Sequence, residues 1–383
     1  NRFLFTFLLK AILLLVFMIL NKTSIPYVVK NILFTRKEPV SLVHFITNRC
    51  NARCSFCFID FDNKDTFKGE LTLNEIDKLT RTFGKSLLNV NLTGGEPFAR
   101  KDITEIAKKY IDNTTIQSIY VTTNGSLPDR AENFAKEIVS YDKKIELTFQ
   151  ISIDDFPENH DSVRKIKKLF ESCIDTYWRL KKIKNTSPVI SITVTHENCD
   201  RIKEIFNYLH KDCNIDAIKC TVVRDEGVYK TPEEKRKKII EAYNWLTIEI
   251  EKLSKSNQLL NYNEKSLQGR LHRKKDFISW KLIKKMYLKP HYISMCYAGR
   301  LFGIIGANGD VYPCEILEDK KLGNLRNNDM NFEKIWNSKN NIDTRKFIKD
   351  SKCNCTYECA LSYNILGNYR YQFSLLKSAF NLD

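Results

Sequence analysis

The sequence predicts an α/β protein whose parallel strands are joined by helices. Strand-like apolar segments alternate about six times with segments of helical period between residues 40 and 223. The most distinctive polar motifs lie where the expected strands end, which is the edge at which α/β sheets bind their ligands. Apolar residues make up 43% of the 383 residues, enough for a large core.

The period of the apolar residues places each element. In 72–85, for example, Leu73, Ile76 and Leu79 recur on one helical face. Strands are expected at 40–47, 88–92, 116–122, 145–153, 189–195 and 216–223. Helices are expected at 72–85, 102–111, 129–139, 161–183 and 200–210.

The pattern changes after residue 226. Residues 231–290 are highly charged and mostly helical in period, whereas 301–314 is typical of a hairpin with a tight turn at Asn308-Gly309-Asp310. We therefore divide the chain into an N-terminal hydrophobic segment with a linker (1–38), a core (39–225), a charged helical insertion (226–290), a small cysteine-containing domain (291–365) and a tail (366–383).

The formal net charge of +16 would suit a nucleic acid or an anionic lipid surface. Acidic residues are interspersed with the lysines, however, as in 233–238, and the sequence has no dense basic block. We interpret the excess as solvated lysines on helix surfaces and expect no nucleic-acid partner.

Residues 3–20 form an apolar run interrupted only by Thr6 and Lys10. A lysine at the centre of a membrane span costs about 2.5–3.5 kcal/mol, which the surrounding apolar residues narrowly offset. More basic residues follow the run than precede it, so an N-terminal hydrophobic helix would anchor the core to the cytoplasmic face of a membrane. A helix lying flat in the interface and a buried core helix are the alternatives.

The twelve cysteines do not indicate a disulfide scaffold, because a chain of this length can build a core without one. Three of them lie within 50–57. Five more follow residue 295, namely Cys296, Cys314, Cys353, Cys355 and Cys359. Such grouping indicates metal or cluster ligation in a reducing compartment, and the remaining four are expected to be small buried hydrophobes.

The first group is a C-x3-C-x2-C run, Cys50, Cys54 and Cys57, on the loop after the first expected strand. Three thiolates on one loop can bind three irons of a [4Fe–4S] cluster and leave the fourth iron open to a small ligand. A zinc site is the alternative, but it would need a fourth ligand, and the nearby His44 lies within the strand.

This spacing, with Phe56 just before the third cysteine, resembles the signature of the radical S-adenosylmethionine (SAM) superfamily, and the resemblance covers residues 40–225. The end of the second expected strand resembles the superfamily's GGE motif, which holds the amino group of the methionine half of SAM. Glycines permit a close backbone approach, and a carboxylate accepts hydrogen bonds from an ammonium group. The motif here consists of Gly94, Gly95, Glu96 and Pro97.

Later strand ends carry polar residues that extend the resemblance. Thr123 and Asn124 match the third strand end, which lines the cofactor pocket in the superfamily. Ser152 and Asp154 resemble the pair that lies near the carboxylate or ribose of the cofactor. Two more strand ends carry residues of the kind that the family keeps in its pocket, Asn198 and Arg224.

The resemblance implies a fold, a chemistry and partners. The fold would be a partial (β/α)6 TIM-like barrel. Cys50, Cys54 and Cys57 would hold a catalytic [4Fe–4S] cluster whose open iron binds SAM. An electron from a reducing partner such as flavodoxin or ferredoxin would then yield a 5′-deoxyadenosyl radical that abstracts hydrogen from an organic substrate.

The second cysteine group has a resemblance of its own. Cys296 and Cys314 flank the hairpin, and the stretches 322–325 and 335–336 and the cysteines of 353–359 follow. Together they resemble the SPASM/twitch extension of peptide-modifying radical enzymes, in which such cysteines bind auxiliary [4Fe–4S] clusters. Five cysteines predict one auxiliary cluster with one cysteine spare, and a structural zinc site is the alternative. A peptide is the leading substrate class, and a small metabolite or lipid precursor is the second.

Two other functions remain open. A non-catalytic, membrane-tethered iron–sulfur electron carrier or partner-binding protein would need the cysteines but not the motifs at 94–97 and 152–154. An RNA modifier is suggested only by the charge. The aromatic residues of 363–373 would line a substrate channel or, as we favour, pack in the core.

Overall fold

The computed structural model describes residues 25–225 and 229–380. The N-terminal hydrophobic helix that we predict at 3–20 lies outside the described residues. Within them, every helix is too short or too polar to cross a bilayer.

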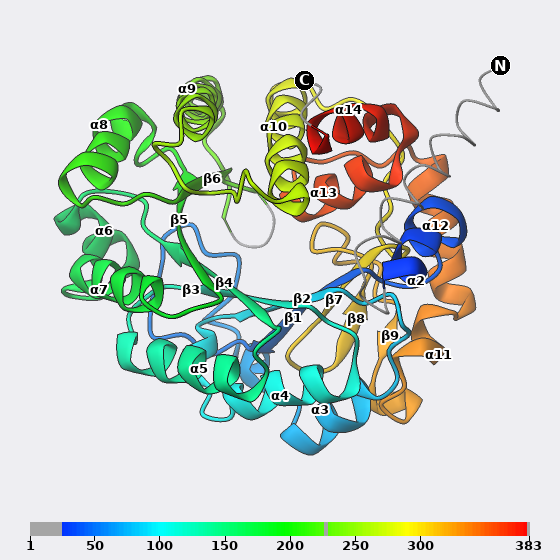
Figure 1. The fold of residues 1–383 in the computed structure, drawn as a ribbon. Coiled ribbons are helices and arrows are strands. Elements are labelled where there is room, and N and C mark those ends of the chain that lie inside the picture. Colours follow the sequence, from blue (N-terminus) through cyan, green and yellow to red (C-terminus); the bar gives the residue numbers. More distant parts are fainter. Residues whose placement is uncertain (1–24, 226–228, 381–383) are drawn as a thin grey trace.

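The described strands form one nine-stranded sheet in the order β6-β5-β4-β3-β2-β1-β7-β8-β9 (Figure 1). The first six pair in parallel with their neighbours, which confirms the predicted α/β fold. Each end lies within three residues of its predicted position. The six strands are β1 (Ser41–Thr47), β2 (Asn89–Gly94), β3 (Ser118–Thr123), β4 (Glu146–Ser152), β5 (Thr186–Val194) and β6 (Ile218–Val222).

Helices cover the outer face of this curved sheet (Figure 1). Each has an apolar face, and the buried residues of α4 are a typical set: Ile103, Ile106, Ala107 and Tyr110. The helices that follow the first five strands are α3 (Leu73–Thr80), α4 (Ile103–Asn113), α5 (Pro128–Tyr141), α6 (Pro157–Arg164), α7 (Leu169–Lys181) and α8 (Ile202–Asn207).

One predicted helix was wrong in its continuity. The expected single helix at 161–183 is two helices, because the chain turns at Lys165 and Lys168, whose φ angles are 60° and 57°. A left-handed residue ends a helix by turning its backbone out of the helical path.

The charged insertion and the tail close the open side of the barrel. Helix α10 (Leu267–Tyr287) contacts both α13 (Glu358–Gly367) and α14 (Tyr369–Ala379), and α9 (Arg236–Lys255) packs on β6. Figure 1 shows these helices grouped on one side of the molecule, with α2 (Ile25–Lys30) nearby.

The C-terminal cysteine-containing part continues the same sheet. Strand β7 (Phe302–Ile305) pairs in parallel with β1, and β8 (Asp310–Tyr312) and β9 (Gly323–Asn324) extend it in antiparallel fashion. The predicted turn between β7 and β8 is confirmed, with Gly309 at a φ of 84°. Two helices follow, α11 (Phe332–Trp336) and α12 (Lys339–Asp350).

An ion pair joins this part to the core. Arg326, just after β9, donates two hydrogen bonds to the Glu75 carboxylate of α3, at 2.6 and 2.9 Å. It donates a third to the Gly69 carbonyl at 2.8 Å. The hydrogen bonds from Arg326 to the Glu75 carboxylate, together with those from Thr72, lower the pKa of Glu75 to about 2. Because this folded-state pKa is below the unfolded value, the pair stabilises the fold above about pH 4.5 and loses that effect as pH falls toward 2.

We predict that Glu75→Gln lowers the free energy of unfolding by about 1 kcal/mol at pH 7, since the pair is partly exposed. Glutamine retains the capping contact to Thr72, so the variant isolates the charge. Urea unfolding at several pH values measures the difference, which shrinks below pH 4.5. Glu105→Gln, in an exposed pair with Lys108, is the control and has a smaller effect. An unchanged midpoint for Glu75→Gln at pH 7 would contradict the prediction.

Candidate active site

The three cysteines of the first group lie on the loop that leaves the carboxyl end of β1. All three are half-buried. The loop is tightly folded, since the Cys57 amide donates to the Cys54 carbonyl at 3.2 Å and the Arg53 amide donates to the Arg164 carbonyl at 3.0 Å. The second contact anchors the loop to the end of α6.

The surroundings of Cys50 suit a cluster ligand. Its sulfur accepts a hydrogen bond from the Ala52 amide at 3.3 Å and one from the Asn124 side chain at 3.8 Å. Burial raises the pKa of the Cys50 thiol to about 11, and the charges of Glu96, Cys54 and Cys57 add to that shift. Three soft thiolates on one short loop match the ligands that iron–sulfur clusters use.

His44 is unsuitable as a fourth ligand. Its Nδ1 hydrogen-bonds to the Tyr110 hydroxyl of α4 at 2.9 Å, and the side chain is fully buried. Burial, together with the charge of Arg100, lowers the pKa of His44 to about 3, so the ring is a neutral part of the core. This removes the residue on which a zinc interpretation of the first group would depend.

Gly94 and Gly95 let the second motif press against the cysteine loop. Gly94 has a φ of 146°, and a Cβ atom there would lie 1.9 Å from the Thr47 carbonyl oxygen. At Gly95 a Cβ atom would lie 2.3 Å from the Arg49 carbonyl oxygen. Without side chains at these two positions, the two backbone segments lie in direct contact. The Gly95 amide donates a hydrogen bond to the Thr47 carbonyl and the Glu96 amide donates one to the Arg49 carbonyl, both at 2.9 Å. Only glycine fits this approach.

Glu96 ties the end of β2 to the end of β3. The side chain is fully buried, and its carboxylate accepts hydrogen bonds from the Phe98 amide, the Thr123 hydroxyl and the Asn124 amide at 3.0, 2.8 and 2.7 Å. Burial raises its pKa to about 7. Pro97 begins the short helical turn that Glu96 caps. These three contacts are all with protein groups. The contact of the Glu96 carboxylate with the SAM amino group, which the resemblance implies, remains a prediction.

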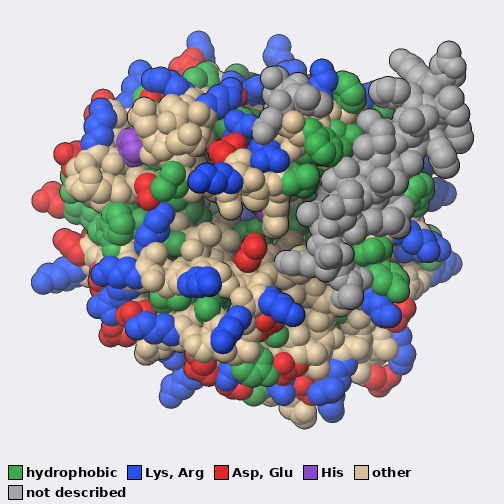
Figure 2. Space-filling view, viewed as in Figure 1, with side chains coloured by type: hydrophobic (Ala, Val, Ile, Leu, Met, Phe, Trp, Pro, Cys, Tyr) green, Lys and Arg blue, Asp and Glu red, His purple; other side chains and the backbone are tan. Residues whose placement is uncertain are grey.

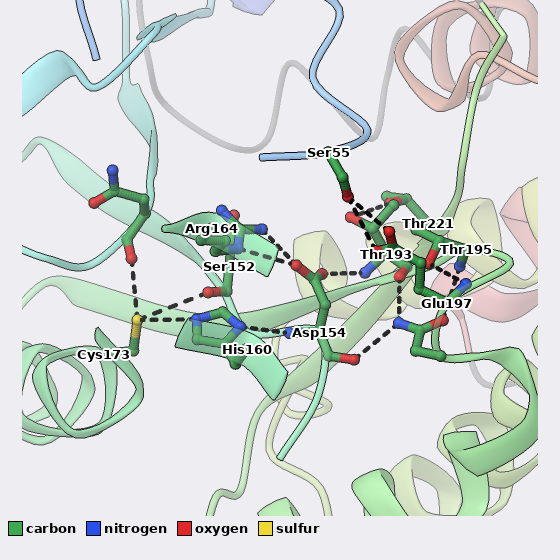
Figure 3. Close-up of polar contacts among 12 residues, drawn as sticks. Ser55, Ser152, Asp154, His160, Arg164, Cys173, Thr193, Thr195, Glu197 and Thr221 are labelled. Carbon is green, nitrogen blue, oxygen red and sulfur yellow. Dashed lines mark hydrogen bonds and ion pairs between the residues drawn. The ribbon is translucent and has the colours of Figure 1, made fainter. Parts of the chain in front are cut away.

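Asp154 lies beyond β4 and is likewise occupied by protein groups. Figure 3 shows its carboxylate between the Arg164 guanidinium and the Thr193 backbone. Arg164 donates to it at 2.5 and 3.1 Å, and the Thr193 amide donates at 2.8 Å. The Asn198 side chain donates to the Asp154 carbonyl at 2.8 Å. Asp154 thus positions Arg164 and β5, and its predicted contact with SAM remains a prediction. Ser152, two residues earlier, is half-buried at the end of β4.

Sequence reasoning missed two polar residues near the cysteine loop. Arg164 is 6% exposed, its guanidinium lies 5.7 Å from the centre of the Phe56 ring, and its charge acts on Cys54. Glu197 accepts hydrogen bonds from Ser55 at 2.9 and 3.0 Å. Neither belongs to a recognisable motif. The only available signal was their position after strands four and five.

Arg224 connects the end of β6 to the second cysteine group. It donates to Glu315 at 2.8 Å, and Glu315 also accepts from the Tyr357 hydroxyl at 2.6 Å. Tyr357 packs in one cluster with all five C-terminal cysteines, Cys296, Cys314, Cys353, Cys355 and Cys359. The structure therefore gathers the cysteines that the sequence predicted to act together. In the described part of the chain, no three His, Cys, Asp or Glu side chains are placed to hold a single metal ion.

We predict that Asp154→Ala lowers the free energy of unfolding by about 3–5 kcal/mol, because it leaves the buried Arg164 charge without its partner. Replacing both residues, as in Asp154→Leu with Arg164→Met, removes the unpaired charge and has a smaller cost. Chemical unfolding of the two variants measures the difference. Equal costs for the single and double variants would show that the pair is not the cause.

Comparison with known proteins agrees with this geometry. Residues 45–209 match the family model described as the radical SAM superfamily, and residues 296–360 match an iron–sulfur cluster-binding domain, SPASM. Both types of domain bind [4Fe–4S] clusters.

Solved structures with the same fold include anSMEcpe with bound AdoMet, at 19% identity and a TM-score of 0.58, covering 90% of this chain and 96% of that one. Another is SuiB from Streptococcus suis bound to S-adenosylmethionine, at 16% identity and a TM-score of 0.56, covering 85% and 71%. At these identities the likeness establishes the fold. With a radical SAM domain and a SPASM domain in one chain, this protein is a member of the radical SAM superfamily with a C-terminal SPASM extension.

Proposed function

We propose that this enzyme reductively cleaves SAM at a cluster held by Cys50, Cys54 and Cys57 and abstracts hydrogen from an organic substrate. The substrate would be a peptide or a small metabolite or lipid precursor. The observation that carries the proposal is the convergence of three motifs. The backbone at Gly94-Gly95 contacts the segment that leads into the cysteine loop. Glu96, just after β2, accepts a hydrogen bond from the Asn124 amide after β3, and the Asn124 side chain donates one to the Cys50 sulfur.

The residues present fit the cofactor pair. When bound, the cluster and SAM supply a 5′-deoxyadenosyl radical that takes a hydrogen atom from the substrate. Gly94, Gly95, Glu96 and Pro97 would shape the methionine end of the SAM site. Thr123, Asn124, Ser152 and Asp154 would shape its remaining walls, and Phe56 would pack beside them.

The protein's contribution is orientation. The Asn124 side chain bridges Cys50 and Asn51, so the third strand end fixes the cysteine loop. Asp154 accepts hydrogen bonds from the Arg164 guanidinium, and the backbone carbonyl of Arg164 accepts a hydrogen bond from the Arg53 amide. These buried contacts would keep the loop in one conformation before and after SAM binds, which preorganises the site.

A second cluster would occupy the C-terminal cysteines. Burial raises the pKa of both Cys355 and Cys359, but their other neighbours differ. Cys355 interacts with Cys296, Cys314 and Cys353, whereas the leading partners of Cys359 are Glu315, the Tyr357 hydroxyl and Glu358. Cys359 also lies on α13 and borders the barrel cavity. We therefore assign the auxiliary cluster to the other four cysteines and leave Cys359 as the spare one.

A peptide substrate has support from the solved neighbours. One is native anSMEcpe with bound AdoMet and the Cp18Cys peptide, and another is SuiB bound to its precursor peptide SuiA. A reducing partner such as flavodoxin or ferredoxin would supply the electron. We further propose that residues 3–20 hold the enzyme at the cytoplasmic face of a membrane, on the basis of their apolar sequence.

We predict that anaerobically reconstituted protein with SAM and dithionite forms 5′-deoxyadenosine. Cys54→Ser would abolish it because a cluster ligand is lost. Cys213→Ser, which changes a half-buried cysteine outside both groups, would leave the yield unchanged. The product is quantified by chromatography beside the iron content. A fully loaded protein that forms no deoxyadenosine would favour the electron-carrier alternative.

We also predict about eight irons per chain, four in each cluster. Cys355→Ser would reduce the count to about four and remove one cluster from the electron paramagnetic resonance spectrum of the reduced protein. Cys359→Ser would retain the wild-type count and spectrum. The assignment fails if Cys359→Ser loses as much iron as Cys355→Ser.

A further inference from the structure

The barrel encloses a cavity of about 410 Å³, a volume typical of small-molecule sites. Its wall includes Ser41, Asn89 and Lys219 near the starts of β1, β2 and β6, and Gln150 and Ser191 on β4 and β5. Figure 2 shows the corresponding face of the molecule hollowed at its centre.

The cavity lies beneath the expected SAM site and is separate from it. None of the cysteines at 50–57 and none of the residues at 94–97 line it. Gln150 lines it, however, and Ser152 lies two residues further along the same face of β4, a distance of about 6–7 Å. A molecule filling the cavity would therefore present one end to the cofactor.

Two cations share one carboxylate in this cavity. The Lys219 ammonium of β6 and the Lys275 ammonium of α10 both contact Asp276, at 3.1 and 3.2 Å. Asp276 also accepts a hydrogen bond from Tyr262 at 2.8 Å. The other carboxylate on the wall, Glu358, is buried, and burial raises its pKa to about 7, so it carries less than a full negative charge near neutral pH. The lysine pair thus has one positive charge more than its shared partner neutralises, and that excess would attract an anion.

Much of the apolar part of the wall comes from helices outside the six-stranded core. Val28 and Val29 of α2, Leu271 and Trp280 of α10 and Leu375 of α14 all face the cavity. An apolar wall beside a pair of cations suits an amphiphile better than a uniformly polar metabolite.

We infer that the cavity is the substrate site and takes an amphiphilic anion, with a carboxylate or phosphate held by Lys219 and Lys275 and an apolar body against α2, α10 and α14. The inference rests on the proposed function and narrows its substrate class. The anion belongs to a free acid or to a lipid headgroup, and the chemistry of recognition is the same for both.

Calorimetric titration of the reconstituted holoprotein with SAM, in the absence of reductant, tests the inference. The probes are decanoate, decyl phosphate, decanol and decyltrimethylammonium. We expect at least one of the two anions to bind at least tenfold more tightly than decanol, and the cation to bind most weakly. Tighter binding of decanoate points to a free acid, and tighter binding of decyl phosphate points to a phospholipid-like headgroup.

Variants connect the affinity to the cavity. Lys219→Met and Lys275→Met should each weaken binding of the preferred anion at least tenfold and leave decanol unchanged. Lys285→Met changes an exposed lysine of the same helix and should alter neither. Ser191→Leu fills the lumen and should weaken both anion and alcohol. Thermal unfolding of each variant confirms that it is folded.

Three outcomes would overturn the inference. They are the absence of saturable binding by either anion, equal affinities for anion and alcohol, and wild-type anion affinity in both Lys219→Met and Lys275→Met. The first of these would favour a peptide substrate. Because binding is measured without radical chemistry, it is independent of 5′-deoxyadenosine formation. Selective binding with no deoxyadenosine would contradict the proposed function alone.

Discussion

The arrangement of the whole molecule depends on β1, which is paired on both edges. It pairs in parallel with β2 on one side and with β7 on the other, and all seven of its residues are buried. The first cysteine loop leaves its carboxyl end, while Cys296 and Cys314 flank the β7–β8 hairpin on its other side. A single strand therefore fixes the positions of both cysteine groups. A cluster-binding extension joined through a flexible linker would lack that constraint.

The second level of organisation is a set of buried hydrogen bonds between strand ends. Glu96 joins β2 to β3, and Asp154 joins β4 to β5 through the Thr193 amide. Asn198 then holds the Asp154 backbone. Each of these polar side chains has protein partners, so it stays buried without the cost of an unpaired polar group. The loops of the site are therefore held in place by the scaffold, as a catalyst that must position a reactive cofactor requires.

What the sequence could predict follows from the range of the interactions involved. The strands and helices are encoded locally, by periods of 2 and 3.6, and the predicted strands were confirmed. The cysteine loop is encoded by close spacing and follows β1, while its role in holding a cluster remains a prediction. The break at Lys165–Lys168 has no glycine or proline to announce it. The pairing of β1 with β7 joins residues more than 250 positions apart, and the hairpin motif shows only its own turn. Arg164 was missed because its role depends on Asp154, a tertiary partner.

The same reasoning explains why the sequence reveals the cofactor and conceals the substrate. SAM and the cluster impose fixed geometry on short loops, so their ligands recur at recognisable spacings. Much of the apolar wall of the cavity, in contrast, comes from α2, α10 and α14, three helices without a motif. Lys219 and Lys275 are two of the 62 lysines and arginines in the chain, and nothing in their sequence neighbourhood distinguishes them. Only the fold brings them together on one carboxylate, so substrate recognition here is a property of the tertiary structure.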